Sequence, residues 1–369
     1  MNVQDDLLFQ ISLQHIPNIG AVHAKTLIEH FGSARNIFHT PMNQLQSIEG
    51  IGHARARNIR KFHDFGKAEK EMRFLEKFRI RPLFLTDALY PQRLLNCYDP
   101  PTMIFFKGVA DLNHPRIVSI VGTRKNSEYG KSCTERIIRD LAKFQPIIIS
   151  GLAFGIDTIA HKVAIRNQVS TIAVLAHGLH TIYPFDNAPL AKEIISSGGL
   201  LSEFPSGTDP DKHNFPSRNR VVAGISDAII VIETGLKGGS MITAELGNSY
   251  NRDVFAVPGR NTDPKSEGCN FLIRNNKAIL LNDGLELAET LGWIEKVPEP
   301  QSIQPELFNK LSEEERQVFH IINESNGIQF DQLKSRTTLS SSQFAAILLS
   351  LEMQNLILSM PGKVFKTCP

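Results

Sequence analysis

Several clusters of glycine, hydroxyl and arginine residues follow apolar runs in this chain, and these residue types together suit contact with phosphate groups. The first cluster is Gly122-Thr123-Arg124, which follows the apolar run Ile117–Val121. Glycine lets the backbone approach a phosphate, threonine offers a hydroxyl, and arginine supplies a fork of donors with a permanent charge. Because open α/β sheets bind ligands at the carboxyl ends of their strands, Gly122, Thr123 and Arg124 are predicted to contact a phosphate.

The segment Gly130–Ser132, with the sequence Gly-Lys-Ser, resembles the end of the P-loop found in nucleotide-hydrolysing enzymes. The P-loop pattern GxxxxGK[ST] requires a glycine at position 125, where this chain has Lys125. Gly122 lies too early for that role, and Arg124 occupies the position of the second glycine in GxGxxG. These departures argue against a hydrolysing P-loop, and the Gly-Lys-Ser segment is expected to belong to the helix that follows.

Two glycine-bearing loops precede helical patterns, where free backbone N–H groups at a helix N-terminus form an anion site. The candidate phosphate contacts in them are Ser150, Gly151 and Gly155 in the first loop, and Lys237, Gly238, Gly239 and Ser240 in the second. Asp157 is predicted to cap the helix after the first loop or to orient that loop. His161, on the same helical face, is expected to make either a structural hydrogen bond or a ligand contact.

A further cluster of donors, Arg218-Asn219-Arg220, is predicted to open a helix that leads into the next buried strand. Since alternate residues at a helix start point apart, one arginine is expected to face the ligand and the other to be structural. His177 and His180 lack a carboxylate or cysteine partner at matching spacing, so no metal site is expected. The chain also shows no nucleophile elbow and no paired carboxylates in a loop, so no cofactor and no catalytic turnover are predicted.

These clusters need a sheet to hold them, and the pattern between residues 82 and 295 predicts one. Short apolar, β-branched runs alternate with helical patterns, as in parallel βαβ units that are covered on both faces. The predicted strands are Ile117–Val121, Ile147–Ser150, Thr171–Ala176, Leu200–Glu203, Ala228–Glu233 and Val254–Val257. We therefore predict an α/β fold with an extended Rossmann-like parallel sheet as its core.

Residues 1–80 are predicted to be helical and contain a weak internal repeat at an offset of 32, which aligns Gly20 with Gly52. Each copy reads as a helix end, a glycine turn and a second helix. This is typical of a helix-hairpin-helix or SAM-like domain, which presents backbone N–H groups to a phosphate. A helical packing domain that touches no DNA is the alternative. Residues 52–81 carry ten Lys/Arg against four Asp/Glu, which makes this the most basic stretch of the chain.

The C-terminal segment, residues 308–369, is predicted to be a winged helix, and a proline-bearing linker, residues 296–307, precedes it. Ser312 with Glu315 forms a capping box for the first of three helices, and two short strands follow the third. From Pro298 to the end the chain carries six Lys/Arg and eight Asp/Glu. Because a winged helix that grips duplex DNA needs a basic face, a protein-contact or regulatory role is favoured over DNA binding.

The composition is that of an ordinary globular protein, with 41% hydrophobic and 21% charged residues and a net charge of +2. No apolar run approaches the roughly 18–20 residues that cross a bilayer, so no membrane association is expected. The four cysteines form no CxxC pair, which fits reduced thiols and a cytoplasmic location. Because the net charge is small, any basic surface for nucleic acid must be local.

Eight blocks occur in the order and with the gaps of a known family: IVGTR, SGLAFGIDTIAH, GLHTIYPFDN, SEFP, FPSRNRVVAGIS, VIETGLKGGSMITA, VFAVPGR and EGCNFLI. Together they cover residues 84–290 and resemble the DNA-processing protein family DprA, also called Smf. The resemblance implies a bacterial, cytoplasmic, non-catalytic protein that binds single-stranded DNA through its Rossmann-like domain. It further implies a homodimer that protects incoming DNA and loads RecA during natural transformation, displacing or coexisting with single-strand binding protein.

The resemblance also assigns roles to residues. The family's phosphate-contacting arginine maps to Arg124, its glycine-rich loops to Ser150–Gly155 and Gly238–Ser240, and its Arg-Asn-Arg segment to Arg218–Arg220.

One position departs from the family pattern, and one segment has two possible roles. Relatives often carry a lysine directly after the Tyr-Pro pair, where this chain has Phe185, a residue able to stack on a base. Phe185 and Asn187 are therefore included among the predicted DNA contacts. The helix that starts near Gly268 resembles the dimer-forming segment of the family, so Phe271 and Ile273 are expected either at a dimer interface or in the core.

An enzyme is the alternative function. The segment GGSMITAE is loosely similar to the PGGxGTxxE loop of the cytokinin-activating phosphoribohydrolases, Rossmann-like enzymes that cleave nucleoside monophosphates. In this chain the threonine falls one residue late and Lys237 replaces the proline. A third possibility, a structural nucleoid protein, would require duplex DNA to bind at least as tightly as a single strand.

Overall fold

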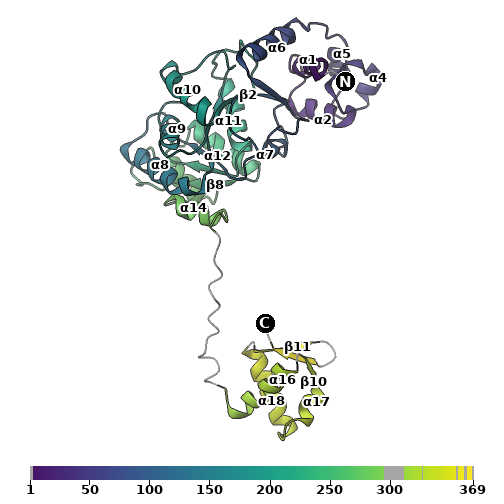
Figure 1. Cartoon of the computed structure of the whole chain (residues 1–369), viewed down its shortest axis with the longest axis vertical. Helices are drawn as coiled ribbons and strands as arrows, with labels where there is room; N and C mark the ends of the chain where they lie inside the picture. Colours follow the sequence, from purple (N-terminus) through teal and green to yellow (C-terminus); the bar gives the residue numbers. More distant parts are fainter. Residues whose placement is uncertain (1–2, 295–310, 326, 355, 361–363, 368–369) are drawn as a thin grey trace. The chain divides into compact units, whose positions relative to one another are not determined.

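The computed structural model describes residues 3–294, 311–325, 327–354, 356–360 and 364–367. The chain divides into two compact units between Ile294 and Glu295, and each unit is described by itself (Figure 1). The predicted linker, residues 296–307, lies outside the described residues. Within the described ranges, no helix has both the length and the apolar character needed to cross a membrane.

The N-terminal part of the first unit is helical, as predicted. Its described helices are α1 (Val3–Leu13), α2 (Ala21–Phe31), α3 (Ala34–His39), α4 (Met42–Gln46), α5 (His53–Arg60) and α6 (Gly66–Phe78). Gly20 precedes α2 and Gly52 precedes α5, so the two copies of the sequence repeat place a glycine turn before a helix in the same way. Asn18 and Gly50, at equivalent positions of the repeat, have positive φ angles of 64° and 79°, which reverse the chain ahead of each helix.

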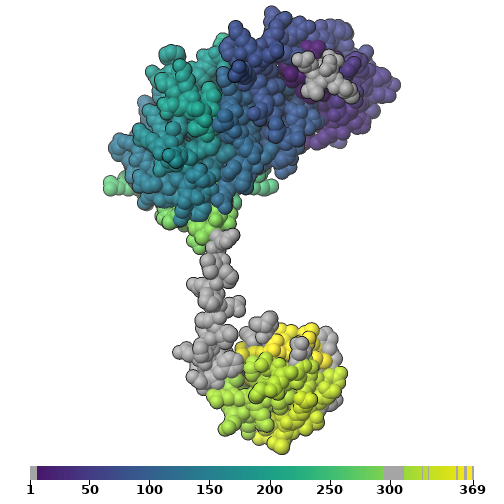
Figure 2. All heavy atoms as spheres, in the orientation of Figure 1, coloured from purple at the N-terminus to yellow at the C-terminus, as the bar shows by residue number. Residues whose placement is uncertain are grey.

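The N-terminal helices pack directly against the sheet-containing part of the same unit, and Figure 2 shows the two as one continuous body (purple to teal). Glu71 of α6 accepts hydrogen bonds from the backbone N–H of Ser206, at 2.9 Å, and from its hydroxyl. The Lys25 ammonium donates to the carbonyl oxygens of Leu95 and Cys97, both at 3.2 Å. These contacts join residues far apart in the sequence and fix the helices on the sheet.

A nine-stranded sheet forms the centre of the first unit, with the strand order β1-β2-β6-β5-β4-β3-β7-β8-β9. Its strands are β1 (Arg81–Phe84), β2 (Met103–Gly108), β3 (Ile117–Val121), β4 (Ile147–Ser150), β5 (Thr171–Leu175), β6 (Gly199–Ser202), β7 (Ala228–Val231), β8 (Asp253–Ala256) and β9 (Ile279–Leu280). The six predicted strands are all present within two residues of their predicted bounds, and they pair in parallel.

The sheet is mixed rather than wholly parallel, and it contains three strands that were not predicted, β1, β2 and β9. β2 pairs antiparallel with β6, and β1 pairs antiparallel with β2. β1 contains Pro82, which lacks the N–H that an inner strand would need and is tolerated here at the edge of the sheet. β9 has only two residues and both are exposed, so its sequence carries no strand signal.

Helices cover both faces of this sheet. Those between and after the strands are α7 (Gln92–Leu95), α8 (Glu128–Leu141), η1 (Ala142–Phe144), α9 (Ile156–Arg166), η2 (Phe185–Asn187), α10 (Ala188–Ser197), α11 (Asn214–Gly224), α12 (Gly239–Ser249), α13 (Glu267–Arg274) and α14 (Gly284–Thr290). Apolar side chains of α8, α9 and α14 form one buried cluster with the strands, and those of α11, α12 and α13 belong to another.

The central strand β3 lies between β4 and β7, and this position creates a crevice. The chain leaves β3 through α8, on one face, and leaves β7 through α12, on the other face. The connections therefore diverge at the carboxyl ends of β3 and β7. Such a switch in direction is where open α/β sheets bind their ligands.

The described residues of the second unit form three helices and a three-stranded antiparallel sheet, which is the predicted winged helix. The elements are α16 (Glu313–Glu324), β10 (Ile328–Gln329), α17 (Phe330–Ser335), α18 (Ser341–Met353), β11 (Ile357–Met360) and β12 (Val364–Thr367), with the strand order β10-β12-β11. Ser312 and Glu315 form the predicted capping box, and Phe344, Leu348 and Leu351 of α18 are buried. The residues of the predicted turn between the last two strands, 361–363, lie outside the described residues.

Candidate phosphate-binding site

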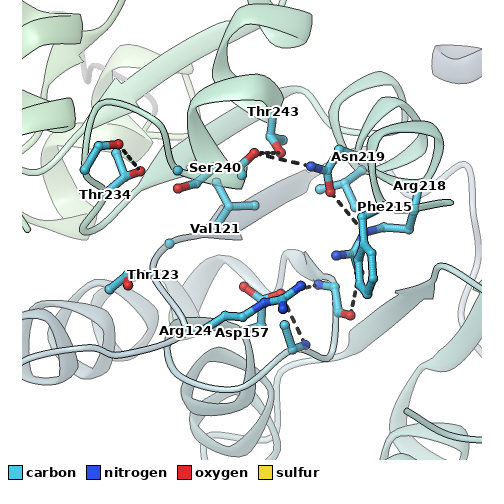
Figure 3. Close-up of a pocket in the computed structure, with 17 residues that line it drawn as sticks. Val121, Thr123, Arg124, Asp157, Phe215, Arg218, Asn219, Thr234, Ser240 and Thr243 are labelled. Atoms are coloured by element: carbon cyan, nitrogen blue, oxygen red, sulfur yellow. Dashed lines mark hydrogen bonds between the residues drawn. The ribbon is translucent and has the colours of Figure 1, made fainter. Parts of the chain in front are cut away.

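A pocket of about 240 Å³ lies at the carboxyl ends of β3, β4 and β7, in the crevice where the connections diverge (Figure 3). Nine of the predicted phosphate contacts line it, namely Gly122, Thr123, Arg124, Gly151, Arg218, Asn219, Gly238, Gly239 and Ser240. The remaining lining residues are Val121, Ala153, Asp157, Phe215, Val222, Thr234, Gly235 and Thr243. The topology thus brings together residues from four separate segments of the chain.

The loop after β3 presents its arginine to solvent. The N–H of Thr123 donates to the Glu233 carbonyl oxygen at 2.8 Å, which ties this loop to the end of β7. A Cβ at Gly122 would lie 2.6 Å from a carbon of Ile156, so only glycine fits there. Arg124 is exposed, and among residues 3–294 it has no ion pair with a carboxylate. Its charge is therefore available to an anion.

The Gly-Lys-Ser segment lies in the first turns of α8, as predicted, and has a packing role. The helix is capped by Ser127, whose N–H donates at 2.9 Å to the buried Glu233 carboxylate, with a second bond from the hydroxyl. A Cβ at Gly130 would lie 2.3 Å from the same carboxylate. Glycine is needed at this position because the Glu233 carboxylate packs against the helix start, and not because a phosphate binds there.

Asp157 holds the loop after β4 in place. Of its two predicted roles, capping the helix or orienting the loop, the structure shows the second. Its carboxylate accepts hydrogen bonds from the N–H groups of Gly151, at 3.1 Å, and Ala153, at 3.4 Å. Burial raises the pKa of Asp157, and the nearby Arg218 guanidinium opposes this shift. The predicted contact Ser150 is fully buried and donates its hydroxyl to the Ile120 carbonyl oxygen, so it supports the loop from below.

Gly155 lies at the end of the same loop and does not line the pocket. Its φ of +78° falls in the left-handed region, and a Cβ would lie 2.3 Å from the carbonyl oxygen of Thr123. Glycine at this position lets the loops after β3 and β4 pack closely. Its contribution to the site is therefore to the shape of the pocket wall.

Helix α11 begins earlier than predicted, at Asn214, so Arg218, Asn219 and Arg220 lie in its second turn and do not open it. The physical reason is Pro216, which is tolerated in the first turn because its missing N–H has no partner there. The prediction had placed the helix start after this proline.

The two arginines of α11 lie in different surroundings. Arg218 is buried in the pocket wall and donates to the carbonyl oxygens of Gly151 and Val174, the latter at 2.8 Å. Burial lowers the pKa of Arg218, the Asp157 carboxylate raises it, and the Arg124 guanidinium lowers it further, so both arginines act on the same space. Arg220 lies outside the pocket lining and pairs with Glu203.

The pairing of Arg220 is part of a partly buried polar cluster. Its guanidinium contacts the Glu203 carboxylate and the Asp99 carbonyl oxygen. Burial raises the pKa of Glu203 to about 7, opposed by the charge of Arg220. Tyr250 donates its hydroxyl to the Asp99 carboxylate at 2.6 Å. These contacts give Arg220 a structural partner within the fold.

The start of α12 leaves backbone donors open toward the pocket. Gly238 caps the helix without a side-chain hydrogen bond, and the N–H groups of Gly239 and Ser240 have no acceptor in the described part of the chain. A Cβ added at Gly239 would have no atom within 4 Å. The protein itself therefore does not require glycine at 239, which leaves the approach of a ligand as its physical use. Asn219 donates to the Gly239 carbonyl oxygen at 3.3 Å and ties the helix start to α11 (Figure 3).

Phe215 is a pocket residue that sequence reasoning missed. The guanidinium carbon of Arg124 lies 4.9 Å from the centre of its ring, and that of Arg218 lies 5.7 Å away. Such cation–π contacts hold an arginine in place without neutralising its charge. The ring also lines a second, smaller hollow next to the pocket, together with Phe154 and Tyr183, which are 46% and 48% exposed. The signal available in the sequence was the position of Phe215 one helical turn before Arg218.

Other predicted contacts lie away from the pocket lining. Asn187 is buried and donates to the Leu152 carbonyl oxygen and the Thr158 hydroxyl, both at 2.9 Å. Phe185 is 83% exposed, and Lys237 is also exposed. The contact of each with DNA stays a prediction.

The residues with open assignments can now be placed. His161 is fully buried and bonds Thr171 at 2.7 Å, so it makes the structural hydrogen bond. Burial lowers the pKa of His161 to about 3. Phe271 and Ile273 of α13 are half-buried and pack against the core, which leaves part of each side chain on the surface.

The chemistry that this pocket can perform is the binding of an anion. Its cations are Arg124 and Arg218, its free donors are backbone N–H groups and hydroxyls, and its lining contains one carboxylate, the hydrogen-bonded Asp157. No group of three or more metal-ligating side chains gathers among the described residues. A volume below the roughly 300–1,000 Å³ of sites for whole small molecules suits a phosphate with part of its sugar.

Comparison with known families matches all three parts of the chain. Residues 81–292 match the family model described as DNA recombination-mediator protein A. Residues 10–70 match a helix-hairpin-helix motif, and residues 298–363 match the DprA winged helix domain.

Known relatives agree with the family matches. The protein Smf of Synechocystis sp. is 36% identical over 293 residues, which are 78% of this chain and 73% of that protein. The crystal structure of DNA processing protein A from Streptococcus pneumoniae superposes with a TM-score of 0.67 at 32% identity, over 76% of this chain and 97% of that one. A structure of DNA processing protein A from Helicobacter pylori, described for its single-stranded DNA binding mode, gives a TM-score of 0.53 at 33% identity, over 58% of this chain and 97% of that one.

Proposed function

The chain belongs to the DprA/Smf family, whose model is described as DNA recombination-mediator protein A, and we propose that it binds single-stranded DNA in the pocket without cleaving it. The observation that carries this proposal is the set of unused donors in the pocket. Arg124 has no carboxylate partner in the described residues, and the first N–H groups of α12 have no acceptor there. The binding mode described for the Helicobacter pylori protein supports the choice of ligand.

The proposed contacts divide between the charged and the backbone donors. Arg124 and the N–H groups of Gly239 and Ser240 bind phosphate oxygens directly, and Arg218 holds the loop of Gly151 in place while adding positive charge. The exposed rings beside the pocket offer faces on which bases stack. Because these contacts recognise phosphate groups and the flat faces of bases, and not the hydrogen-bonding edges of bases, binding is expected to depend little on the DNA sequence.

Replacing Arg124 tests the site. Arg124→Ala should weaken binding of a single-stranded oligonucleotide and make its salt dependence shallower by about 0.7, the value for one phosphate contact on a single strand. Arg124→Lys should restore part of the affinity, since it restores the charge without the planar fork. Fluorescence anisotropy at several salt concentrations measures both quantities. Wild-type affinity in Arg124→Ala at moderate salt would show that the site is misplaced.

We also propose the finer family role for this chain: a homodimer that protects incoming single strands and loads RecA onto them in natural transformation, alongside single-strand binding protein. The half-buried residues Phe271 and Ile273 support the dimer, because two further apolar residues, Ile279 and Leu280, follow them within ten positions and are 46% and 39% exposed. A Phe271→Glu variant that still elutes as a dimer at micromolar concentration would exclude this interface. A RecA filament-formation assay on strands coated with single-strand binding protein tests the loading.

The enzyme alternative has one observation in its favour, the position of Thr243 and the glycine loop in the pocket lining. Against it, Glu245 of α12 is exposed, lies outside the lining and pairs with Lys277 at 3.6 Å. Incubation with nucleoside monophosphates and chromatography for released base separates the two functions. We expect no base, because the pocket lining offers no second carboxylate beside Asp157.

A further inference from the structure

One surface of α6 is strongly basic and has no role in the pocket. Its cations, here called the α6 stripe, are Lys67, Lys70, Arg73 and Lys77. At 100° per residue these four side chains fall within one third of the helix circumference. The exposed glutamates Glu69 and Glu76 fall beyond the edge of this sector, and the third acid, Glu71, is buried. The helix therefore separates its charges and presents one positive side.

The cations of the α6 stripe are not used by the fold. All four side chains are exposed, and none has an ion pair within residues 3–294. Unpaired like charges along one helix repel each other, which costs stability unless an anion binds. Such an arrangement favours a polyanionic ligand.

Two aromatic residues of α6 lie in or beside this sector: Phe74 falls inside it, and Phe78 falls about 20° beyond its edge. Phe78 is 42% exposed, and its ring centre is 4.6 Å from that of Phe74. The ammonium groups of Lys77 and Lys107 lie 5.3 Å and 5.9 Å from the Phe78 ring centre. Alternating cations and rings are the combination that binds a nucleic acid strand by its phosphates and bases.

The α6 stripe is connected to the pocket by loops that contact each other. Buried Glu71, on the inner side of α6, bonds Ser206 of the loop between β6 and α11. In the same loop, the Thr208 carbonyl oxygen accepts from Gly178 at 2.9 Å. The neighbouring His177 lines the hollow that shares Phe215 with the pocket. Figure 1 shows α6 between the N-terminal helices and the sheet, on the side of β2.

We propose that the α6 stripe binds the phosphate backbone of the single strand beyond the pocket, so that the DNA site of this chain extends onto its N-terminal helices. From Lys67 to Lys77 the helix rises about 15 Å, at 1.5 Å per residue, enough to follow several phosphates. This inference rests on the proposed function, because it extends the same strand. Duplex DNA offers the same phosphate chemistry, so the experiment must separate the two sources.

The experiment compares two oligonucleotide lengths. A short strand of roughly 6 nucleotides, near the lower end of known single-strand site sizes, fills the pocket alone, whereas one of roughly 20 also reaches α6. The test variant is Lys67→Ala/Lys70→Ala/Lys77→Ala in the full chain. Its matched control is Arg139→Ala/Lys143→Ala/Arg166→Ala, which removes equal charge from exposed positions at the C-terminal ends of α8 and α9 and in η1.

The expected result is a loss confined to the long strand. At about 0.15 M salt, counterion release makes each phosphate contact on a single strand worth about fourfold in affinity, so three contacts amount to about 50-fold. The slope of log affinity against log salt should become shallower by about 2 for the long strand. The short strand should bind the test variant within threefold of wild type, and the control variant should match wild type on both strands.

Three outcomes would overturn the proposal. Unchanged affinity for the long strand would show that the α6 stripe is not a contact, while wild-type binding of the short strand would leave the pocket assignment intact. Equal losses for both lengths would mean that the stripe does not lie beyond the pocket. An equal loss for a blunt duplex of the same length would assign the stripe to duplex DNA. Failure of wild type to bind either strand would instead remove the proposed function itself.

Discussion

Adding a single methyl group at Gly239 should make the protein more stable and its DNA binding weaker. Gly239 is the first residue of α12, its φ is not in the left-handed region, and a Cβ there would meet no atom within 4 Å. Gly239→Ala should therefore stabilise the fold by about 0.4–1 kcal/mol, because alanine restricts the unfolded chain. The same methyl group stands where the backbone N–H would approach a phosphate.

The expected loss of affinity follows from the hydrogen bonds at stake. A hydrogen bond from a backbone N–H to a charged group contributes about 1.5–3 kcal/mol, so Gly239→Ala should weaken binding roughly 10- to 150-fold. Anisotropy with a short single strand measures the binding, and urea unfolding measures the stability. Gly66→Ala is a matched control at the first residue of α6, where the nearest atom to a Cβ is 3.5 Å away.

The control should gain similar stability and keep wild-type affinity for the short strand. If Gly239→Ala binds as tightly as wild type, the start of α12 does not approach the ligand, and the argument from its unused donors fails. If Gly239→Ala loses both stability and binding, the space that we describe beside Gly239 is not open.

Three further predictions concern the residues that support the pocket. Arg218→Met should lower the free energy of unfolding by about 3–5 kcal/mol, because it leaves the Asp157 carboxylate buried without its cation. Arg124→Ala should change the free energy of unfolding by less than about 0.5 kcal/mol. Equal losses of the two variants in urea unfolding would contradict this contrast. Gly151→Ala should cost about 1–3 kcal/mol and lower the melting temperature, since its Cβ would lie 2.0 Å from the Arg218 guanidinium; a melting temperature equal to that of wild type would show that Arg218 moves freely. Burial lowers the pKa of His161 from 6.5 to about 3, so the unfolded chain binds a proton at a higher pH than the folded protein does. The contribution of His161 to the free energy of unfolding is therefore complete above pH 6.5 and is lost as the pH falls toward 3. A His161→Gln variant with the same pH dependence of unfolding as wild type would refute this.

The central strands and their loops were predictable because burial makes their sequences unambiguous. β3, β4 and β5 are buried at every position, so each reads as an apolar run bounded by polar residues. Gly122, Gly151 and Gly239 then fell at the carboxyl ends of strands or at a helix start, where the physics of parallel sheets places a ligand.

The parts that were missed depend on contacts between distant segments. Nothing local in Met103–Gly108 indicates that β2 runs antiparallel to β6, because direction is set by the connections around it. Phe215 has no phosphate chemistry of its own, and its role appears only when Arg124 and Arg218 lie over its ring. The start of α11 was misplaced because Arg218 was taken as its first residue, although a first helical turn also accepts Pro216.

The most direct test of single-strand binding is a competition measurement on the full chain. A labelled single strand is bound at about 0.15 M salt, and unlabelled single-stranded and duplex DNA of the same sequence are titrated against it, with Arg124→Ala measured in parallel. The account predicts that the single strand competes at a concentration at least about tenfold lower than the duplex, and that Arg124→Ala reduces binding of the single strand. Equal competition by duplex DNA, or wild-type affinity in Arg124→Ala, would contradict it.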